Sequence, residues 1–321
     1  MLNKGITLRG LEVFEALAKS GSVAQAAEAT GLSQPAVSQQ LRNLEKALGS
    51  GLVDHARRPM RLTPAGRSFL VRAQAVLGEL RLAQSELTVM DLSELTSLSI
   101  GLIDDFDNDL TPRLATILAD SLTQCRLKIV TAPSIEIGRA IQARELHVAV
   151  AASTGEPLDG ITEYPLVRDP FVIVAPVDTV RDPDRALRDL VSLPLLRYAS
   201  DQLIARQIEG HLARLRLDAP SRFEIGSHLA LMAMVARRIG WAVTTPLGYM
   251  RAARFHDHIA AFPLPVGGAA RTISLFAGAD WADRVPRDMA GTMRQLLVSQ
   301  MIEPAVARLP WLVGSLEVIE G

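Results

Sequence analysis

Apolar residues near the N-terminus recur at helical spacing in blocks separated by glycines. The apolar positions of the first block are Leu8, Leu11, Phe14 and Leu17, and those of a later block are Val37, Leu41, Leu44 and Leu48. Each set lies on one face of a helix. Between the two blocks, the run VAQAAEAT predicts a short helix of small residues that stops at Gly31. The pattern therefore predicts three helices, the first ending near Gly21 and the third starting after Ser33.

The spacing of Ala27, Gly31 and Val37 across the second and third helices fits a helix-turn-helix. Ala27 lets the two helices approach closely, Gly31 suits the positive φ of the turn, and Val37 fills the angle between them. An ordinary helical hairpin with small residues around a glycine is the alternative. Ser33 is placed to cap the third helix, with Pro35 in its first turn.

The face of the third helix opposite its apolar stripe carries amide, hydroxyl and guanidinium groups, and it has no carboxylate before Glu45. In a major groove, glutamine pairs with adenine, arginine with guanine, and serine with either a base or a phosphate. A carboxylate there would repel the phosphates. This face therefore predicts contact with DNA, and a merely solvated polar face is the alternative. The predicted DNA-binding residues are Ser33, Gln34, Pro35, Ser38, Gln39 and Arg42.

Residues 52–63 (LVDHARRPMRLT) predict a short hairpin whose turn holds Arg57, Arg58 and Pro59. We interpret it as a wing whose arginines, together with Arg61, contact DNA phosphates or the minor groove. An exposed basic turn without a DNA role is the alternative. Residues 1–66 hold eight lysines and arginines against five acids, a net charge of +3, while the whole chain has −1, which leaves −4 for the remainder. A basic head on an acidic body is typical of an anion-binding module fused to another domain.

Thr63 and Pro64 start a long helix whose next break is near residues 91–93. Roughly 26 residues at a rise of 1.5 Å give about 40 Å. Apolar positions along it repeat at the spacing of a short coiled coil, which predicts self-association, with packing against its own chain as the alternative. The predicted dimerisation residues are Leu70, Ala73, Leu77, Leu80 and Leu87.

The remainder of the chain alternates short β-rich runs with amphipathic helices, which predicts parallel α/β sheets. The runs are 98–103, 126–131, 147–152, 170–176, 194–199, 222–226, 241–246 and 271–278. We expect two α/β units joined by two crossings, near 164–169 and 263–268, with a ligand cleft between them.

The sequence contains none of the common nucleotide-binding, zinc-protease or serine-hydrolase motifs, so we predict neither a catalytic residue nor a metal site. The six histidines show no metal-ligand spacing apart from the pair His256 and His258, which we interpret as a surface pair. Cys125 is the single cysteine, which excludes an internal disulfide. The chain contains no apolar run of membrane-spanning length and no secretory signal, so we expect a cytoplasmic protein without a membrane partner and without a cofactor.

Acidic residues cluster directly after the first β-run of the body, at Asp104, Asp105, Asp107 and Asp109. Leucine stands where a calcium loop needs its glycine, so we reject an EF-hand. Because ligands bind at the carboxyl ends of strands in open α/β sheets, Asp104 and Asp105 predict a site for a cationic or hydroxyl-rich effector; a helix cap is the alternative. The other candidate effector-binding residues are Ser134, Ser200, Ser227 and Thr245.

Over residues 6–70 the chain resembles the LysR-type transcriptional regulators of bacteria. LRGLEVFEALAKSGSVAQAAEATGLSQPAVSQQLRNLEKALG and RLTPAG carry the resemblance, which continues more loosely through LSIGLI, ELHVAVAAS, RDPFVIVAP and MVARRIGWAVTTP. It implies an α/β protein with an N-terminal winged helix-turn-helix, a linker helix and a periplasmic-binding-protein-like effector domain. The expected bounds are 1–63, 64–92 and 93–321, with effector subdomains at 98–166 plus 267–300 and at 167–266.

The resemblance also implies a ligand-responsive, sequence-specific regulator and not an enzyme. It implies a homodimer, commonly assembled into a homotetramer, on double-stranded promoter DNA, and a small molecule in the cleft that alters DNA bending and contact with RNA polymerase. Two departures stand out. The family usually has Leu-Phe-x-Arg before the wing, and this chain has Leu52-Val53-Asp54-His55, which predicts weaker wing packing and one basic contact fewer. Asp104 and Asp105 stand where the family usually has a serine or threonine. The tail 301–321 extends past the usual end and suggests no role.

Overall fold

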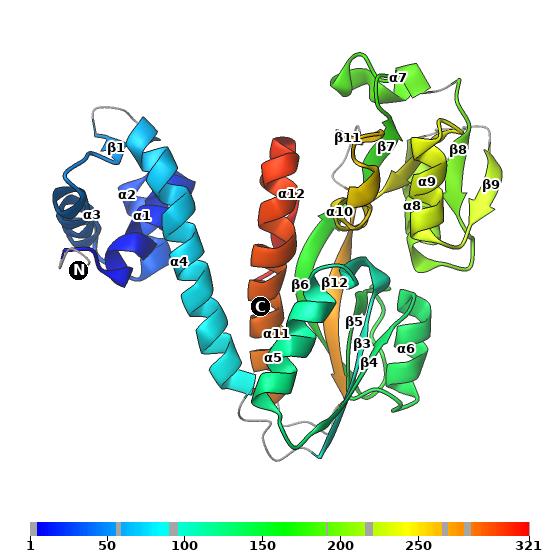
Figure 1. Ribbon diagram of the computed structural model, residues 1–321, viewed down its shortest axis with the longest axis horizontal. Coiled ribbons are helices and arrows are strands. Elements are labelled where there is room, and N and C mark those ends of the chain that lie inside the picture. Colours follow the sequence, from blue (N-terminus) through cyan, green and yellow to red (C-terminus); the bar gives the residue numbers. More distant parts are fainter. Residues whose placement is uncertain are drawn as a thin grey trace. The chain divides into compact units, whose positions relative to one another are not determined.

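The computed structural model describes residues 5–55, 59–89, 96–190, 192–215, 221–264, 269–278 and 284–320. The chain divides into two compact units, Met1–Gln84 and Ser85–Gly321 (Figure 1). Across the described ranges, no helix combines the length and the apolar character that a membrane span requires.

The described part of the first unit folds as helices with a small hairpin. Its elements are α1 (Leu8–Ser20), α2 (Val23–Thr30), α3 (Gln34–Leu48), β1 (Val53–Asp54), β2 (Arg61–Leu62) and α4 (Pro64–Val89), of which the last runs past the end of the unit. The strands β1 and β2 pair antiparallel, with Val53 opposite Leu62. This order confirms the predicted winged helix-turn-helix.

Glycines end the first three helices. Gly21, Gly31 and Gly49 take φ values of 63°, 65° and 66°, in the left-handed region that side chains with a Cβ rarely adopt. At the start of α3, the Ser33 hydroxyl accepts a hydrogen bond from the Ala36 N–H over 3.4 Å. The predicted ends of α1 and α2 and the predicted cap of α3 are therefore confirmed.

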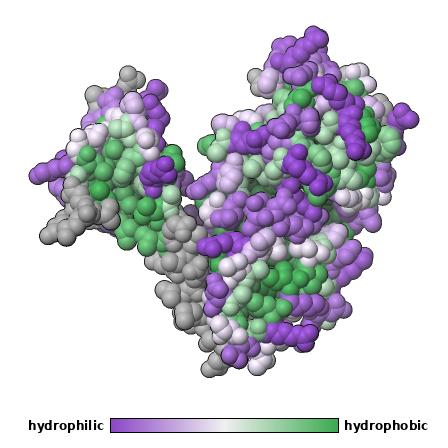
Figure 2. All heavy atoms as spheres, viewed as in Figure 1, coloured by the Kyte–Doolittle hydropathy of each residue, from purple (hydrophilic) through white to green (hydrophobic). Residues whose placement is uncertain are grey.

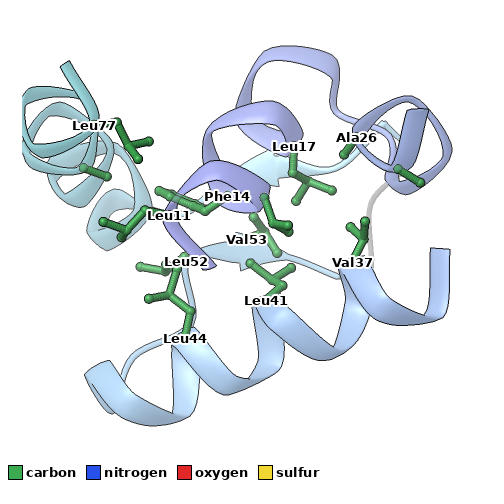
Figure 3. Packing of buried hydrophobic residues seen from close by; sticks show 13 residues of the cluster. Leu11, Phe14, Leu17, Ala26, Val37, Leu41, Leu44, Leu52, Val53 and Leu77 are labelled. Atoms are coloured by element: carbon green, nitrogen blue, oxygen red, sulfur yellow. The ribbon is translucent and has the colours of Figure 1, made fainter. Parts of the chain in front are cut away.

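A single hydrophobic core holds the helices and the hairpin together (Figure 3). Phe14 and Val37 are fully buried, and Ala27 is buried where α2 approaches α3. The hairpin contributes Leu52 and Val53, which are 1% and 4% exposed. The sequence had suggested that valine in place of phenylalanine loosens the wing. Val53 is nevertheless a member of the core, and the effect of its smaller side chain on the packing of the wing stays a prediction.

The second unit contains two β-sheets. The first sheet has the order β13-β6-β12-β5-β3-β4 and the second has the order β11-β7-β10-β8-β9. The strands of the first are β3 (Ser97–Leu102), β4 (Arg126–Thr131), β5 (Val148–Ala152), β6 (Ile161–Pro170), β12 (Ala270–Gly278) and β13 (Glu317–Val318). Those of the second are β7 (Val172–Pro176), β8 (Leu195–Tyr198), β9 (Ser221–Ile225), β10 (Trp241–Thr244) and β11 (Ile259–Pro263). All eight predicted runs overlap a strand.

Both sheets are mixed, which corrects the prediction of parallel sheets. Parallel pairing joins β3 to β4 and β5, and β8 to β9 and β10. The strands β6, β7, β11 and β12 pair antiparallel with their neighbours. The chain leaves the first sheet through β6 and enters the second through β7, so the predicted crossing at 164–169 is part of a long strand. The other predicted crossing lies partly outside the described residues.

Helices cover the sheets of the second unit. Around the first sheet, α6 (Ser134–Gln142) lies against one face, and α5 (Leu110–Ser121) and α11 (Arg284–Leu297) lie against the other (Figure 1). The second sheet carries α7 (Ala186–Leu190), α8 (Leu203–Arg214), α9 (His228–Ala236) and α10 (Pro246–Arg251). A short turn of helix, η2 (Asp104–Phe106), follows β3. We call the first sheet with its helices the first half, and the second sheet with its helices the second half.

The C-terminal tail is part of this fold. A π-helical turn (Val298–Ile302) joins α11 to α12 (Glu303–Arg308), and a short helix, η6 (Pro310–Leu312), leads to β13. Leu312 and Leu316 are 0% and 3% exposed. Because β13 pairs with β6, the tail covers an edge strand that would otherwise present unpaired backbone groups.

Candidate functional site

The polar residues of α3 lie on its exposed face. Gln34, Gln39 and Arg42 are exposed and Ser38 is half-buried. A guanidinium nitrogen of Arg42 donates to Gln39 Oε1 over 2.9 Å, and Gln39 Nε2 donates to Asn43 Oδ1 over 2.8 Å. These neutral partners leave the positive charge of Arg42 available to a phosphate or a guanine, since arginine has five N–H donors.

A groove of about 670 Å³ runs beside this face. Its lining residues are Val23, Gln34, Pro35, Ser38, Leu41, Arg42, His55 and Met60. The structure therefore brings together four of the predicted DNA-binding residues of α3. Of the other two, Gln39 lies on the same helix outside the lining, and Ser33 caps the helix. The sequence had not singled out His55 as a binding residue.

The hairpin is fixed to α3 by one carboxylate. Glu45 Oε1 accepts hydrogen bonds from the N–H groups of Leu52 at 2.7 Å and Val53 at 3.2 Å, and Glu45 Oε2 lies 3.1 Å from His55 Nε2. Of the predicted wing arginines, Arg61 is exposed on β2. Arg57 and Arg58 lie outside the described residues.

The predicted coiled-coil seam on α4 is largely covered by its own unit. Ala73 and Leu77 are 2% and 4% exposed within the core of the first unit, and Leu70 packs against that core. Leu80 is 39% exposed. The side chain of Leu87 lies outside the described part of the structure. Packing against its own chain, the alternative reading of the pattern, is thus what the structure shows for Leu70, Ala73 and Leu77.

The acidic cluster after β3 is bound by an arginine of the second half. Arg251, at the end of α10, donates to Asp104 Oδ2 over 2.6 Å and to Asp107 Oδ2 over 3.1 Å. Asn108 Nδ2 donates to the Arg251 carbonyl over 2.8 Å. These bonds join the two halves at a junction where Figure 2 shows a band of hydrophilic residues. The acidic cluster of the first half is therefore bonded directly to the second half through Arg251.

Deeper in the junction, Arg271 bridges two buried carboxylates. It donates to Asp105 Oδ2 over 2.5 Å, and its Nε donates to Asp169 Oδ2 over 2.9 Å. Burial alone would raise the pKa of Asp105, but Arg271, together with His228 and Arg251, holds that pKa below its usual value. Burial raises the pKa of Asp169 to about 6, against the lowering effect of the same arginine. Burial alone would lower the pKa of Arg271, yet the two carboxylates raise it.

The predicted effector-binding carboxylates thus already have partners in the same chain. Asp104 is held by Arg251 and Asp105 by Arg271. A cationic effector at Asp105 would have to displace a buried guanidinium, whereas the Asp104 side chain is 43% exposed. Their role in effector binding stays a prediction.

Most of the candidate effector-binding hydroxyl groups accept hydrogen bonds from backbone N–H groups. Ser227 caps α9 by accepting from the Ala230 N–H, and Thr245 caps α10 by accepting from the Gly248 N–H, each over 3.3 Å. Thr245 also accepts a hydrogen bond from Arg271 over 3.1 Å. The remaining two are Ser134, whose Oγ accepts from the Ala152 N–H over 3.1 Å, and Ser200, which is exposed in the turn after β8.

A buried polar group beside the junction escaped the sequence analysis. Tyr198 Oη lies 2.7 Å from both His228 Nδ1 and Thr244 Oγ1, and His228 Nε2 lies 2.7 Å from the Gly248 carbonyl. Burial lowers the pKa of His228, against the raising effect of Asp105. A neutral ring then donates from Nε2 to Gly248 and accepts from Tyr198 at Nδ1. No local sequence pattern predicts this hydrogen-bonded group, because Tyr198, His228 and Thr244 belong to different helices and strands.

Among the described residues, no group of three or more histidine, cysteine, aspartate or glutamate side chains is arranged to hold a metal ion. The single cysteine, Cys125, is half-buried.

Two family profiles match the chain. The profile described as "Bacterial regulatory helix-turn-helix protein, lysR family" matches residues 8–67, and "LysR substrate binding domain" matches residues 93–280, more than half of the chain. The chain belongs to the LysR family. This confirms the resemblance seen in the sequence. The first profile covers α1 to the start of α4 of this LysR-type regulator, and the second covers β3 to β12, so α11, α12 and β13 lie beyond it.

Characterised relatives of this LysR-type regulator are transcriptional regulators. It is 28% identical over 204 residues to the regulator CfxR of Cupriavidus necator, an alignment that spans 64% of this chain and 62%, slightly less than two thirds, of CfxR. It is 26% identical over 239 residues to the regulator BbuR of Bordetella bronchiseptica, with 74% of each chain covered. Its fold is similar to that of a C206 mutant of Corynebacterium glutamicum OxyR, with a TM-score of 0.55, 22% identity, and 94% and 95% of the two chains covered.

Proposed function

We propose that this LysR-type regulator binds promoter DNA sequence-specifically through the exposed face of α3. The groove beside that face is the observation that carries the proposal. Among the described residues that line it are amide, hydroxyl, guanidinium and imidazole side chains and no carboxylate. Such groups donate to base edges and phosphates without repelling the DNA backbone. Arg57, Arg58 and Arg61 belong to the same proposed interface.

The proposal includes self-association through α4, as a homodimer and further as a homotetramer. Because Ala73 and Leu77 are covered by their own unit, we place the contact on exposed apolar residues of the helix. Val71, Val76 and Leu80 are 63%, 48% and 39% exposed. A dimer presents two copies of α3 to two half-sites of DNA. We keep 1–63, 64–92 and 93–321 as the head, linker and effector domain of this assembly.

We further propose that a small molecule held between the two halves of the second unit changes DNA bending and, through contact with RNA polymerase, transcription. The ion pairs of Arg251 with Asp104 and Asp107 support this, because they cross between the halves and change if the halves move. We propose no catalytic step, since the relatives are regulators and the buried Tyr198 and His228 are engaged with each other. Action on DNA places the protein in the cytoplasm.

Selection of DNA duplexes from a random pool tests the DNA-binding proposal. The selected duplex is then used with Arg42→Ala, and with Arg139→Ala, an exposed arginine on α6 of the second unit, as the matched control. If Arg42 makes a bidentate base contact, its loss weakens binding by about 1–3 kcal/mol. The control should bind as the wild type does. Failure to select any duplex, or equal binding by both variants, would contradict the proposal.

A thermal-shift screen against small amines, polyols, sugars and carboxylates tests the effector proposal. A ligand at a hundred times its Kd stabilises the folded state by about 2.7 kcal/mol. We expect an amine or polyol to stabilise the wild type and not Asp104→Ala. The control is Asp120→Ala, an exposed acid on α5. If only carboxylates stabilise the protein, and Asp104→Ala responds equally, the acidic cluster has no part in effector recognition.

A further inference from the structure

The C-terminal tail, from α12 to the end of β13, pairs with the strand through which the chain crosses between the two halves. In β13, Val318 lies opposite Val167 of β6. The N–H of the following residue, Ile319, donates to the Leu166 carbonyl over 2.9 Å. Since β6 continues almost directly into β7, the tail pairs with β6 just before the chain enters the second half.

The first sheet is narrow at this crossing. The strand β12 pairs with β6 as far as Pro170, whereas β5 pairs with β12 only as far as Ile273. Glu317 of β13 lies opposite Arg168, at the start of the narrow part. Within the described strands, the tail thus adds a third strand beside the pair of β6 and β12. An isolated pair of strands is only marginally stable in water, and a third strand stabilises it.

Side chains fix the tail to the first half. Leu312 and Leu316 are buried. A guanidinium nitrogen of Arg168, on β6, donates to the Ser315 carbonyl over 2.6 Å. The tail is therefore anchored on both sides of η6, by its strand and by its apolar side chains.

The same tail reaches the second half through α12, which packs against α10. In the last turn of α12, Arg308 Nε donates to Tyr249 Oη over 3.5 Å. Tyr249 is 2% exposed, and its ring stacks on His256 with 4.2 Å between the ring centroids. Because Tyr249 is fixed within the second half, a movement of α10 away from the first half breaks its contact with Arg308.

The helix α10 also carries bonds of the junction. Arg251 donates to Asp104 and Asp107 of the first half. Thr245, which caps α10, accepts a hydrogen bond from Arg271. If the halves move, α10 shifts relative to η2 and α12, and β6 bends at the crossing. The tail opposes both changes, because its strand stiffens the crossing and its helix contacts α10.

We propose that the C-terminal tail is a brace that restricts the movement of the second half relative to the first. By pairing with β6 and contacting α10, it favours the arrangement in which Arg251 is bonded to Asp104 and Asp107. The consequence for ligand binding rests on the proposed effector function. An effector that uses Asp104 has to act against the brace, because in this arrangement Arg251 already occupies one oxygen of that carboxylate.

Distances between spin labels on the two halves test the brace. Full-length protein with Cys125→Ser is labelled at Arg139→Cys on α6 and Ala213→Cys on α8, both of which are exposed positions. An excess of unlabelled protein ensures that only labels within one chain are measured. Pulsed electron paramagnetic resonance then gives the distribution of distances between the halves. We expect a single narrow distribution when the tail is intact.

Ile319→Pro loosens the strand of the brace, because it removes the N–H that donates to Leu166. It should broaden the distribution of distances. Hydrogen exchange in peptides spanning residues 166–172 should become roughly twofold to tenfold faster, the effect of one lost backbone hydrogen bond. Glu320→Pro, at the exposed neighbouring residue, is the matched control and should change neither measurement.

Arg308→Ala loosens the helix of the brace, because it removes the contact with Tyr249. It should also broaden the distribution of distances. Arg237→Ala, at an exposed arginine that follows α9, is the matched control and should leave the distribution unchanged. Thermal melts establish that each variant is folded. If Ile319→Pro does not fold, Arg308→Ala decides the test, since the Arg308 residue is exposed.

Distributions of equal width in the wild type, Ile319→Pro and Arg308→Ala would overturn the proposal. Faster hydrogen exchange in Ile319→Pro without any change in the distances would also overturn it, since the tail would then stabilise the sheet without restricting the halves. If the distances broaden as expected but no compound stabilises the protein in the thermal-shift screen, the brace is supported and the effector proposal alone fails.

Discussion

The exposed face of α3 and the buried junction of the second unit both gather charged and hydroxyl side chains, but they use their charges in opposite ways. Arg42 is exposed and its hydrogen bond goes to a neutral amide. Arg271 is 5% exposed, and its guanidinium forms ion pairs with both Asp105 and Asp169. A charge that has a buried partner stabilises the fold, whereas an exposed charge with a neutral partner is available to a ligand. Burial and partners, rather than residue type, separate the two roles.

The largest expected effect is that of removing the arginine at the centre of the junction. Arg271→Met leaves Asp105 and Asp169 buried without their cation, which costs about 3–5 kcal/mol of unfolding free energy. Urea denaturation followed by tryptophan fluorescence measures it, because all three tryptophans lie in the second unit. Arg139→Met on the surface of α6 is the control. A loss of unfolding free energy below about 1 kcal/mol is typical of a surface ion pair. Such a result would show that the buried charges of the junction stabilise the fold no more than exposed charges do.

The next effect depends on pH and comes from Asp169. Its pKa is raised from 3.8 to about 6 in the folded state, so between these values the folded state binds more protons than the unfolded state. The unfolding free energy due to this group therefore falls as pH rises from about 4 to 6, by at most about 1.4 kcal/mol per pH unit.

Asp169→Asn removes that titration and leaves one carboxylate for one arginine. The difference in unfolding free energy, wild type minus variant, should decrease between pH 4.5 and 7. Urea denaturation at several pH values measures this difference. A difference that stays constant, or that rises with pH, would show that Asp169 is ionised throughout.

The smallest effect on stability is expected at the face of α3. Arg42→Ala removes one hydrogen bond between exposed side chains, and it should change the unfolding free energy by no more than about 0.5 kcal/mol. Thermal unfolding of the full chain, monitored by circular dichroism, checks this because the first unit contains no tryptophan. A large loss of stability would place Arg42 among the residues that hold the fold, and its effect on DNA binding would then need another explanation.

The fold of the first unit was predictable from the sequence because each of its signals is local. A helix with one buried face has an apolar stripe in its sequence, and a helix that ends in the left-handed backbone conformation has a glycine there. The local sequence therefore predicted α1, α2 and α3. The strands of the second unit were found for the same reason, apart from β6, β11 and β13. The strand β6 contains two prolines and charged residues, and β13 is only two residues long.

The sequence by itself determined the family, the polar face of α3 and most of the helices and strands, since periodicity records which side of an element is buried. Only the tertiary structure decided the partners. Arg271 meets Asp105 across 166 positions of the chain, and the seam of α4 packs on its own unit because α1 and the hairpin cover it. The sequence has four aspartates within the six residues 104–109, and this cluster predicted a ligand-binding site. The fold places arginines against three of the four, because pairing at long range follows from strand order and helix packing, which no local pattern encodes.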